Sequence, residues 1–281
     1  MACELCDDTG WKPVDDPSTG VRRVVRCDCR RERSIQQRLA DANLPKRYQH
    51  CTLANFTAYN ESLERAASKA RRLAEGFHGI GRGLLLEGPP GVGKTHLAVA
   101  VLKHVVEHAG ARAVFYDTRD LLRVIRSTYD PSIRTTELDI LRPVMTADLL
   151  VLDDLGAEKT SEWVDETMNL IVNTRYNERR LTVFTSNYMD IPDDTDPNSL
   201  LFRIGFRMRS RLHEMCEFVE MDGADYRELP VNGGVDDLVT QWKMRKKPLP
   251  SRAGRQARAQ LREPVRDGKA DLKWPGGRAG S

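Results

Sequence analysis

The chain has 281 residues, of which 40% are apolar and 30% charged, so it can bury a substantial core and is not a disordered polymer. Its longest unbroken apolar run is the six residues from Leu97 to Leu102, far short of the roughly 20 that a membrane-spanning helix needs. The formal net charge is only +3, but residues 243–281 carry 12 basic and 3 acidic side chains. This basic tail is expected either to contact a polyanion or to be a solubilising disordered end.

The amino-terminal residues lack the basic and apolar regions of a signal peptide, so we expect a cytoplasmic protein that makes no membrane contact. In that compartment the six cysteines are expected to be thiols or metal ligands and not disulfides. Cys51 and Cys216 have no partners at ligand spacing and are expected to be packed thiols.

The other four cysteines lie in the first 33 residues, which have too few apolar side chains to form a core unaided. Cys3 and Cys6 are spaced as C-x-x-C, and Cys27 and Cys29 as C-x-C. Four thiolates can close a tetrahedral Zn²⁺ site, and metal binding would supply folding energy that the apolar residues do not. Redox dithiols and unligated cysteines are the alternatives. Six arginines among residues 22–33 would give this zinc knuckle a positive face for nucleic acid or an acidic protein.

After the knuckle, the pattern predicts a helix at 34–42, a connector and a helix at 61–75. From there short apolar runs alternate with helical patterns. The predicted strands are 84–86, 113–116, 149–152, 181–184 and 216–221, and the helices between them are 94–108, 118–128, 161–179 and 199–213. Apolar strands that alternate with helices indicate a mostly parallel sheet covered on both faces, so the predicted fold class is α/β. A last helix is predicted at 235–246, before the tail.

A glycine-rich segment between the first of these strands and its helix matches the phosphate-binding pattern G-x-x-x-x-G-K-[ST]. Its residues are Gly88, Pro89, Pro90, Gly91, Val92, Gly93, Lys94 and Thr95. Glycines let the backbone N–H groups face a phosphate, while Lys94 reaches the outer phosphates and the Thr95 hydroxyl binds Mg²⁺. We expect His96, the next residue, to belong to the same nucleotide site. The alternative is a plain Gly/Pro-rich turn.

Polar side chains also follow two later strands. Asp153 and Asp154 end the strand at 149–152, where open α/β sheets present their ligand site. Asp153 would hold Mg²⁺ and Asp154 would orient the attacking water, although Asp-Asp is also ordinary turn chemistry. Asn187 follows the strand at 181–184 and can lie beside the γ-phosphate, unless it too belongs to a simple turn.

Arginines supply the remaining candidates, because a permanently charged guanidinium can stabilise the γ-phosphate of a neighbouring subunit. The residues concerned are Arg203, Arg207, Arg209 and Arg211 on a predicted helix, and Arg227 after the last strand. The sequence does not choose among them.

Together these motifs resemble the AAA+ ATPases of the DnaC/DnaI helicase-loader and IstB transposition-helper group. The resemblance spans about residues 44–228. It is carried by the phosphate-binding loop, the Asp153-Asp154 pair with residues 155–159, Thr185-Ser186-Asn187, Arg207-x-x-x-Arg211-Leu212 and Asp225-Tyr226-Arg227.

The resemblance implies a P-loop NTPase (AAA+) three-layer fold with a five-stranded parallel sheet. It also implies that Asn187 is a sensor, Arg227 a second sensor and Arg211 the arginine finger, with Arg207 in reserve. The predicted segments are the knuckle (1–33), a helix and connector (34–57), the ATPase core (58–230), and a helix with a disordered basic tail (231–281).

The function expected from this resemblance is ATP-dependent loading of a replicative helicase onto single-stranded DNA by a homo-oligomer that shares ATP sites between subunits. The alternatives are an IstB-like transposition helper, and a zinc-containing DNA-binding protein whose nucleotide site is a switch with negligible turnover.

Overall fold

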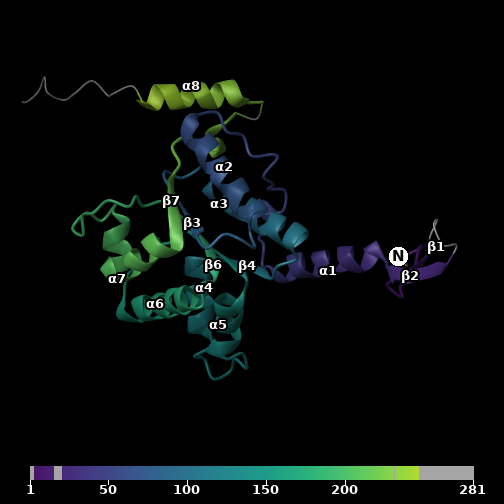
Figure 1. The fold of residues 1–281 in the computed structure, drawn as a ribbon. Coiled ribbons are helices and arrows are strands. Elements are labelled where there is room, and N and C mark those ends of the chain that lie inside the picture. Colours follow the sequence, from purple (N-terminus) through teal and green to yellow (C-terminus); the bar gives the residue numbers. More distant parts are fainter. Residues whose placement is uncertain (1–2, 16–20, 231, 247–281) are drawn as a thin grey trace, which may run out of the picture. The chain divides into compact units, whose positions relative to one another are not determined.

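A central parallel sheet organises the computed structural model, which describes residues 3–15, 21–230 and 232–246 (Figure 1). The sheet has five strands in the order β4-β5-β6-β3-β7, and each neighbouring pair is parallel. The strands are β3 (Gly83–Glu87), β4 (Ala113–Asp117), β5 (Leu149–Asp153), β6 (Leu181–Ser186) and β7 (Cys216–Glu220). The predicted α/β class and five-stranded sheet are confirmed.

Alternate residues of each strand enter two apolar layers, as expected for parallel strands buried on both faces. On β5, Leu149 and Val151 lie in one layer, and Leu150 and Leu152 lie in the other. The first layer holds α2 (Glu61–Glu75) and α3 (Lys94–His104). The second holds α4 (Thr118–Ser127), α5 (Glu137–Thr146), α6 (Glu162–Asn177) and α7 (Leu200–Met215). Helices thus cover both faces of the sheet, as predicted (Figure 1).

Side-chain caps begin the helices of this core, with one exception. The caps of α2, α4, α5, α6 and α7 are Asn60, Asp117, Thr136, Ser161 and Ser199. Each accepts a hydrogen bond from a backbone N–H of the first turn, which satisfies a donor that the helix cannot. Helix α3 instead follows Gly93 and has no side-chain cap. Its first N–H groups are therefore available to an anion.

Helix α5 was not predicted, because Pro143 lies inside it and proline normally disrupts a helix interior. Its start is stabilised by a capping box between Thr136 and Asp139. Its end is held by the fully buried Arg175, whose guanidinium donates to the carbonyls of Val144 and Ala147 at 2.9 and 3.0 Å. Burial lowers the pKa of Arg175 to about 9, so these carbonyls compensate for the lost hydration of a buried cation.

Other elements differ from prediction at their ends. Helix α1 is Asp28–Asp41 and so begins six residues before the predicted start, in a stretch with no apolar face. An unpredicted hairpin precedes it, made by β1 (Trp11–Asp15) and β2 (Arg22–Arg26). The helix predicted at 94–108 ends at His104 and continues as a π-helical turn, Val105–Ala109. Helix α7 is kinked at Gly205, whose φ of 74° is left-handed.

Two short 3₁₀ turns, Lys46–Tyr48 and Tyr226–Glu228, flank the core, and α8 (Val235–Lys246) ends the described chain. The basic tail predicted after it lies outside the described residues. The described residues up to Trp242 form one unit, and the boundaries predicted at residues 33, 57 and 230 stay predictions. No helix in the described part of the chain combines the length and the apolar character needed to span a membrane.

Candidate nucleotide and metal sites

The predicted phosphate-binding loop joins β3 to α3 at the carboxyl edge of the sheet. Gly88, Gly91 and Gly93 have positive φ values of 145°, 81° and 96°, which residues with a side chain rarely adopt. Glycine is also required sterically at Gly91, where a Cβ would lie 1.8 Å from Asp225 Oδ1. The loop therefore leads the backbone into the uncapped end of α3, an arrangement that binds phosphate.

Lys94 lies in this loop with its amino group surrounded by oxygen atoms. Its Nζ donates to Gly88 O, Pro89 O and Asn187 Oδ1, each at 2.7 Å. The side chain is 5% exposed, and burial lowers its pKa to about 8, while the nearby Asp154 and Asp153 carboxylates act to raise that pKa. The ammonium is thus held where an anionic ligand would offset its lost hydration.

Asp153 is buried and is bonded by the hydroxyls of two other elements. Its carboxylate accepts hydrogen bonds from Thr95 Oγ1 at 2.9 Å and from Thr185 Oγ1 at 2.6 Å. Burial raises the pKa of Asp153 to about 6, against the lowering effect of those two bonds. Carboxylate and hydroxyl oxygens are ligands that Mg²⁺ accepts, so Thr95 and Asp153 could together hold this ion.

Asp154, by contrast, is partly exposed and stands in the left-handed region with φ 58°. Its backbone N–H donates to Thr185 Oγ1 at 2.9 Å, and its Oδ1 accepts from Asn187 Nδ2 at 2.8 Å. Arg119 Nη2 lies 3.8 Å from Asp154 Oδ2. Asn187 therefore joins Lys94 to Asp154, because its amide oxygen bonds the first and its amide nitrogen bonds the second.

Two segments distant in sequence lie against the loop. The Tyr226 N–H donates to Gly91 O at 3.1 Å. The positive charge of Arg227 adds to the effect of burial in lowering the pKa of Lys94. Phe56, in the connector, packs its ring against Gly93. A Cβ on Gly93 would lie 2.7 Å from the Phe56 ring. The His96 imidazole faces the connector, with Nε2 3.1 Å from Thr52 O, so its side chain does not join the loop.

Arg211 and Arg207 lie on α7 after the kink. Arg211 Nη1 donates to Arg207 O at 3.0 Å, and both side chains line an open pocket of about 520 Å³. The rest of the lining comes from α6, chiefly Glu162, Asp165 and Glu166. In the described part of the chain, the arginine finger candidates contact α6 and α7 and are not bonded to the phosphate-binding loop.

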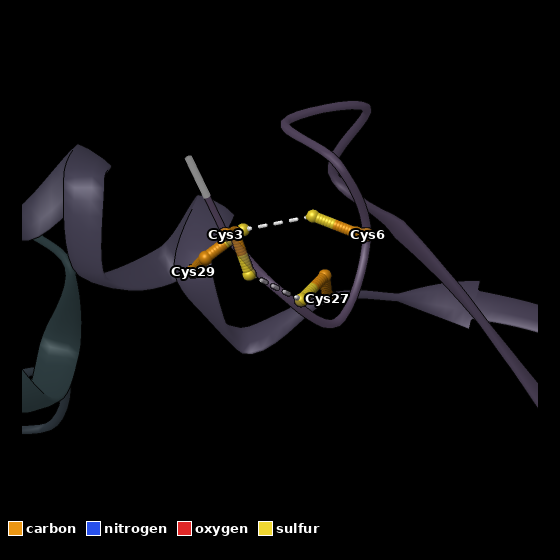
Figure 2. Close-up of side chains that lie close together, drawn as sticks. All are labelled: Cys3, Cys6, Cys27 and Cys29. Carbon is orange, nitrogen blue, oxygen red and sulfur yellow. Dashed lines mark hydrogen bonds between the residues drawn. The ribbon is translucent and has the colours of Figure 1, made fainter. Parts of the chain in front are cut away.

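Figure 2 shows the four cysteines of the amino-terminal segment turned toward one another. All four sulfur atoms lie within 4.8 Å of one another, with Cys3 to Cys27 at 3.8 Å and Cys6 to Cys29 at 3.3 Å. A tetrahedral zinc site with Zn–S bonds of about 2.3 Å requires sulfurs about 3.8 Å apart. The cluster could therefore hold a metal ion.

The ionisation of these thiols also suits a metal. Burial acts to raise the pKa of Cys6, but hydrogen bonds from Cys29 and its neighbours bring it to about 7. The same hydrogen bond raises the pKa of Cys29. Close thiols oppose ionisation of one another, and a bound cation would favour the thiolate form of each. Burial raises the pKa of Cys51, and raises that of Cys216 to about 12, in agreement with packed thiols.

Three side chains around the paired aspartates were given no role from the sequence. Thr185 bonds both of them, Arg119 approaches Asp154, and Glu158 is buried four residues after Asp154. The sequence did indicate the position of Thr185, because this residue precedes Asn187 by two residues and so lies at the same end of the sheet. No local pattern marks Arg119, which is one of several arginines on an amphipathic helix.

Residues 26–229 match the family described as IstB-like ATP binding protein. The replicative helicase loader DnaC of Escherichia coli strain K12 is 30% identical over 140 residues, which cover 50% of this chain and 56% of that protein. The replicative helicase loader DnaI of Bacillus subtilis strain 168 is 32% identical over 154 residues, which cover 54% of this chain and 46% of that protein. The chain therefore spans about half the length of these relatives.

A solved structure has a fold similar to that of this chain. The crystal structure of the DnaC helicase loader aligns with a TM-score of 0.55 and 35% sequence identity, over 63% of this chain and 100% of that one. This similarity confirms the predicted P-loop NTPase (AAA+) fold.

We predict that Lys94→Ala weakens nucleotide binding by about 10- to 100-fold, the equivalent of the roughly 1.5–3 kcal/mol of a hydrogen bond to a charged group. The thermal unfolding midpoint at pH 7 should not fall, because the folded-state pKa of Lys94 is lowered and its charged form opposes folding below about pH 8. Titration of a fluorescent ATP analogue and a thermal melt measure the two effects.

Lys69→Ala is the control, since that lysine pairs with Glu217 at 2.8 Å, away from the loop. Undiminished binding in folded Lys94→Ala protein would contradict the assignment of the loop.

Proposed function

We propose that this chain, which belongs to the IstB-like ATP-binding protein family, hydrolyses ATP and loads a replicative helicase onto DNA. The observation that carries hydrolysis is the bonded series Lys94, Asn187 and Asp154, beside the Asp153 carboxylate. In this series a buried ammonium, an amide and a carboxylate lie within hydrogen-bond reach of one another, which supports roles as phosphate-binding cation, sensor and base. Loading rests on the similarity to proteins named replicative helicase loaders.

Each residue then has a distinct role. The backbone N–H groups of the loop and of the start of α3 bind the phosphates, and Lys94 compensates their charge. Thr95 and Asp153 would hold Mg²⁺, which would neutralise charge on the β- and γ-phosphate oxygens. Asp154 orients and polarises the attacking water, and Asn187 keeps the Asp154 carboxylate directed toward the γ-phosphate. Arg227 is a second sensor that reaches the nucleotide from the segment after β7.

The proposed partners are a replicative DNA helicase, which this protein would load, and single-stranded DNA, onto which the helicase would be loaded. The family name favours one second candidate, an IstB-like helper that acts on DNA for a transposase. Both candidates use the same ATP site, so the partner protein distinguishes them. A zinc-containing DNA-binding protein with a nucleotide switch would bind ATP but show negligible turnover.

Helicase loading is tested with circular single-stranded DNA, a purified hexameric replicative helicase, ATP and this protein. We expect the protein to increase the amount of helicase that encircles the DNA, and Lys94→Ala to abolish this increase. Asp154→Asn should bind ATP normally but hydrolyse it about 100-fold more slowly, because the amide keeps the shape and lacks the charge that polarises water.

Arg123→Ala is the matched control, because Arg123 is exposed on α4 and pairs only one turn away, with Asp120 at 2.9 Å. ATP hydrolysis without any effect on the helicase would contradict the loader and favour the transposition helper. ATP binding without hydrolysis would favour the switch.

We further infer that Arg211 completes the ATP site of an adjoining subunit. The side chain is partly exposed and lines an open pocket on α6 and α7, where it is not bonded to the phosphate-binding loop in the described part of the chain. An arginine finger supplied by a neighbour fits this position, because the charge that develops on the γ-phosphate needs a further cation.

If Arg211 acts in this way, hydrolysis per chain should rise with protein concentration. Arg211→Ala should bind ATP normally and hydrolyse it slowly, with a loss of about 1,000-fold, the lower end for a finger arginine. Mixing it with Lys94→Ala should restore part of the activity, since one variant keeps its phosphate site and the other keeps its arginine. Arg207→Ala tests the reserve residue. Concentration-independent turnover with no rescue would contradict a shared site.

We also propose that Cys3, Cys6, Cys27 and Cys29 bind one structural Zn²⁺. Support comes from the clustered sulfurs and from the exposure of β1 and β2, which leaves this segment without an apolar core. Cys27 precedes α1 and Cys29 lies in its first turn, so the ion would connect the start of this helix to the amino-terminal turn.

Elemental analysis of freshly purified protein should give about one zinc per chain. Replacement of any of the four cysteines by serine should release the metal, whereas Cys51→Ser and Cys216→Ser should retain it. Metal-free protein with an intact amino-terminal segment would show that the cysteines are unligated.

A further inference from the structure

Asp190 binds two basic side chains of α7 with one carboxylate. Its Oδ1 accepts from Arg209 Nε at 2.5 Å, and its Oδ2 accepts from Arg209 Nη2 at 2.9 Å. His213, one turn further along the helix, has its Nε2 2.9 Å from Asp190 Oδ2. The side chains of Asp190 and Arg209 are 11% and 23% exposed, so solvent screens this forked pair only weakly.

The backbone around Asp190 is bonded on two sides. The Asp190 N–H donates to Glu87 Oε2 at 2.7 Å, at the end of β3. The carbonyl of the preceding residue, Met189, accepts from the Leu200 N–H at 2.8 Å. Asp190 is therefore held between the strand that leads into the phosphate-binding loop and the start of α7. It also lies only three residues after Asn187.

Helix α7 is interrupted between its start and residues 206–215. Gly205 has φ 74° and ψ 163°, which lie outside the helical range. The start of α7 therefore does not by itself orient the second segment. Met208 and Leu212 bury one face of that segment, but apolar packing is not directional. The forked hydrogen bonds of Arg209 are directional, so they can fix how the segment is turned.

Arg209 lies between the two finger candidates on this segment. Arg207 and Arg211 line the open pocket beside α6, whereas Arg209 is bonded to Asp190. Residues two apart face different sides of a helix, so the three arginines cannot all point the same way. The direction in which Asp190 holds Arg209 thus sets the direction in which Arg207 and Arg211 project.

The last turn of α7 has anchors that do not involve the Asp190 carboxylate. Arg82 Nη2 donates to His213 O at 2.7 Å, and the Tyr176 hydroxyl donates to Glu214 Oε2 at 2.7 Å. We therefore expect the helix to stay folded without the Asp190 pair, while its middle turn loses its fixed direction.

We propose that Asp190 is a positioning residue for the arginine finger. It holds Arg209 and His213 so that Arg211, on another side of the same segment, is directed at the γ-phosphate of an adjoining subunit. One short loop then carries Asn187, the sensor of its own ATP site, and the support for the finger that acts on the next site. The inference rests on the proposed function, in which Arg211 completes a neighbour's ATP site.

ATP hydrolysis by variants tests this role. Asp190→Asn keeps the shape of the side chain and removes the charge that binds Arg209 and His213. Alone, it should lower kcat by about 100-fold with KM for ATP unchanged, because its finger is displaced while its own phosphate site is intact. Arg209→Ala should show the same loss, and the double variant should be no slower, since both residues act through one pair.

Mixtures of variants show on which subunit Asp190 acts. Lys94→Ala lacks a phosphate site and keeps its finger. An equal mixture with Asp190→Asn should reach about a quarter of the wild-type rate, the share of random interfaces that join an intact site to an intact finger. Arg211→Ala keeps its phosphate site and lacks its finger, so its mixture with Asp190→Asn should show no increase.

The reference mixture is Lys94→Ala with Arg211→Ala, which restores activity through a shared site alone. Arg123→Ala, exposed on α4, is the control and should leave hydrolysis unchanged. A thermal melt shows whether each variant is folded. Should Asp190→Asn fail to fold, Arg209→Lys should give the same pattern in the same mixtures, because it keeps a cation beside Asp190 and loses the second arm of the fork.

Wild-type hydrolysis by Asp190→Asn would overturn the inference. Activity restored by Arg211→Ala would also overturn it, because Asp190 would then support the finger poorly placed by no defect of its own and act on the site of its own subunit. If neither mixture gains activity while the reference mixture does, Asp190 has only a general structural role. No gain in the reference mixture would instead overturn the shared ATP site, and this inference with it.

Discussion

The buried carboxylate of Asp153 is the interaction on which the rest of the site depends. It accepts hydrogen bonds from Thr95 at the start of α3 and from Thr185 on β6, so one side chain of β5 joins three elements. Its own carbonyl accepts from Thr118 at the start of α4. Because burial raises its pKa, the ionised form depends on these hydroxyls and on any cation bound beside them.

Lys94, the proposed phosphate-binding lysine, also depends on oxygen atoms that compensate for its burial. Lys94 is buried and bonds carbonyls of its own loop, so an incoming phosphate would compete with those oxygens for the ammonium. Asn187 shares the same ammonium and also bonds Asp154. The ammonium that would meet a phosphate is therefore connected to Asp154 through one side chain.

A second, partly buried network extends from β3 toward α7. Glu87, the last residue of β3, accepts from the Asp190 N–H at 2.7 Å, and burial raises the pKa of Glu87 to about 7. Asp190 in turn accepts from Arg209 at 2.5 and 2.9 Å and lies 2.9 Å from His213 Nε2. The helix that carries Arg207 and Arg211 is thus anchored beside the strand that leads into the loop.

Local sequence patterns predicted the parallel sheet, the loop, the paired aspartates and the cysteine pairs. These features are encoded within a few residues: strand periodicity, glycine where φ must be positive, and ligand spacing. Arg119, Glu158 and the double role of Thr185 could not be predicted in this way. Thr185 bonds Asp153 and Asp154, which lie 32 and 31 residues earlier in the chain, and Arg119 approaches Asp154 from a different helix. Packing of β4, β5 and β6 brings these residues together.

Helix α5 was also not predicted, because a residue distant in the chain stabilises its end. Pro143 argues locally against a helix, and the guanidinium of Arg175, which satisfies its terminal carbonyls, comes from α6. Residue type and spacing therefore specified which chemistry the chain carries. The partners of each charge were specified by burial, because a buried polar group must find its donor or acceptor in whatever element packs against it.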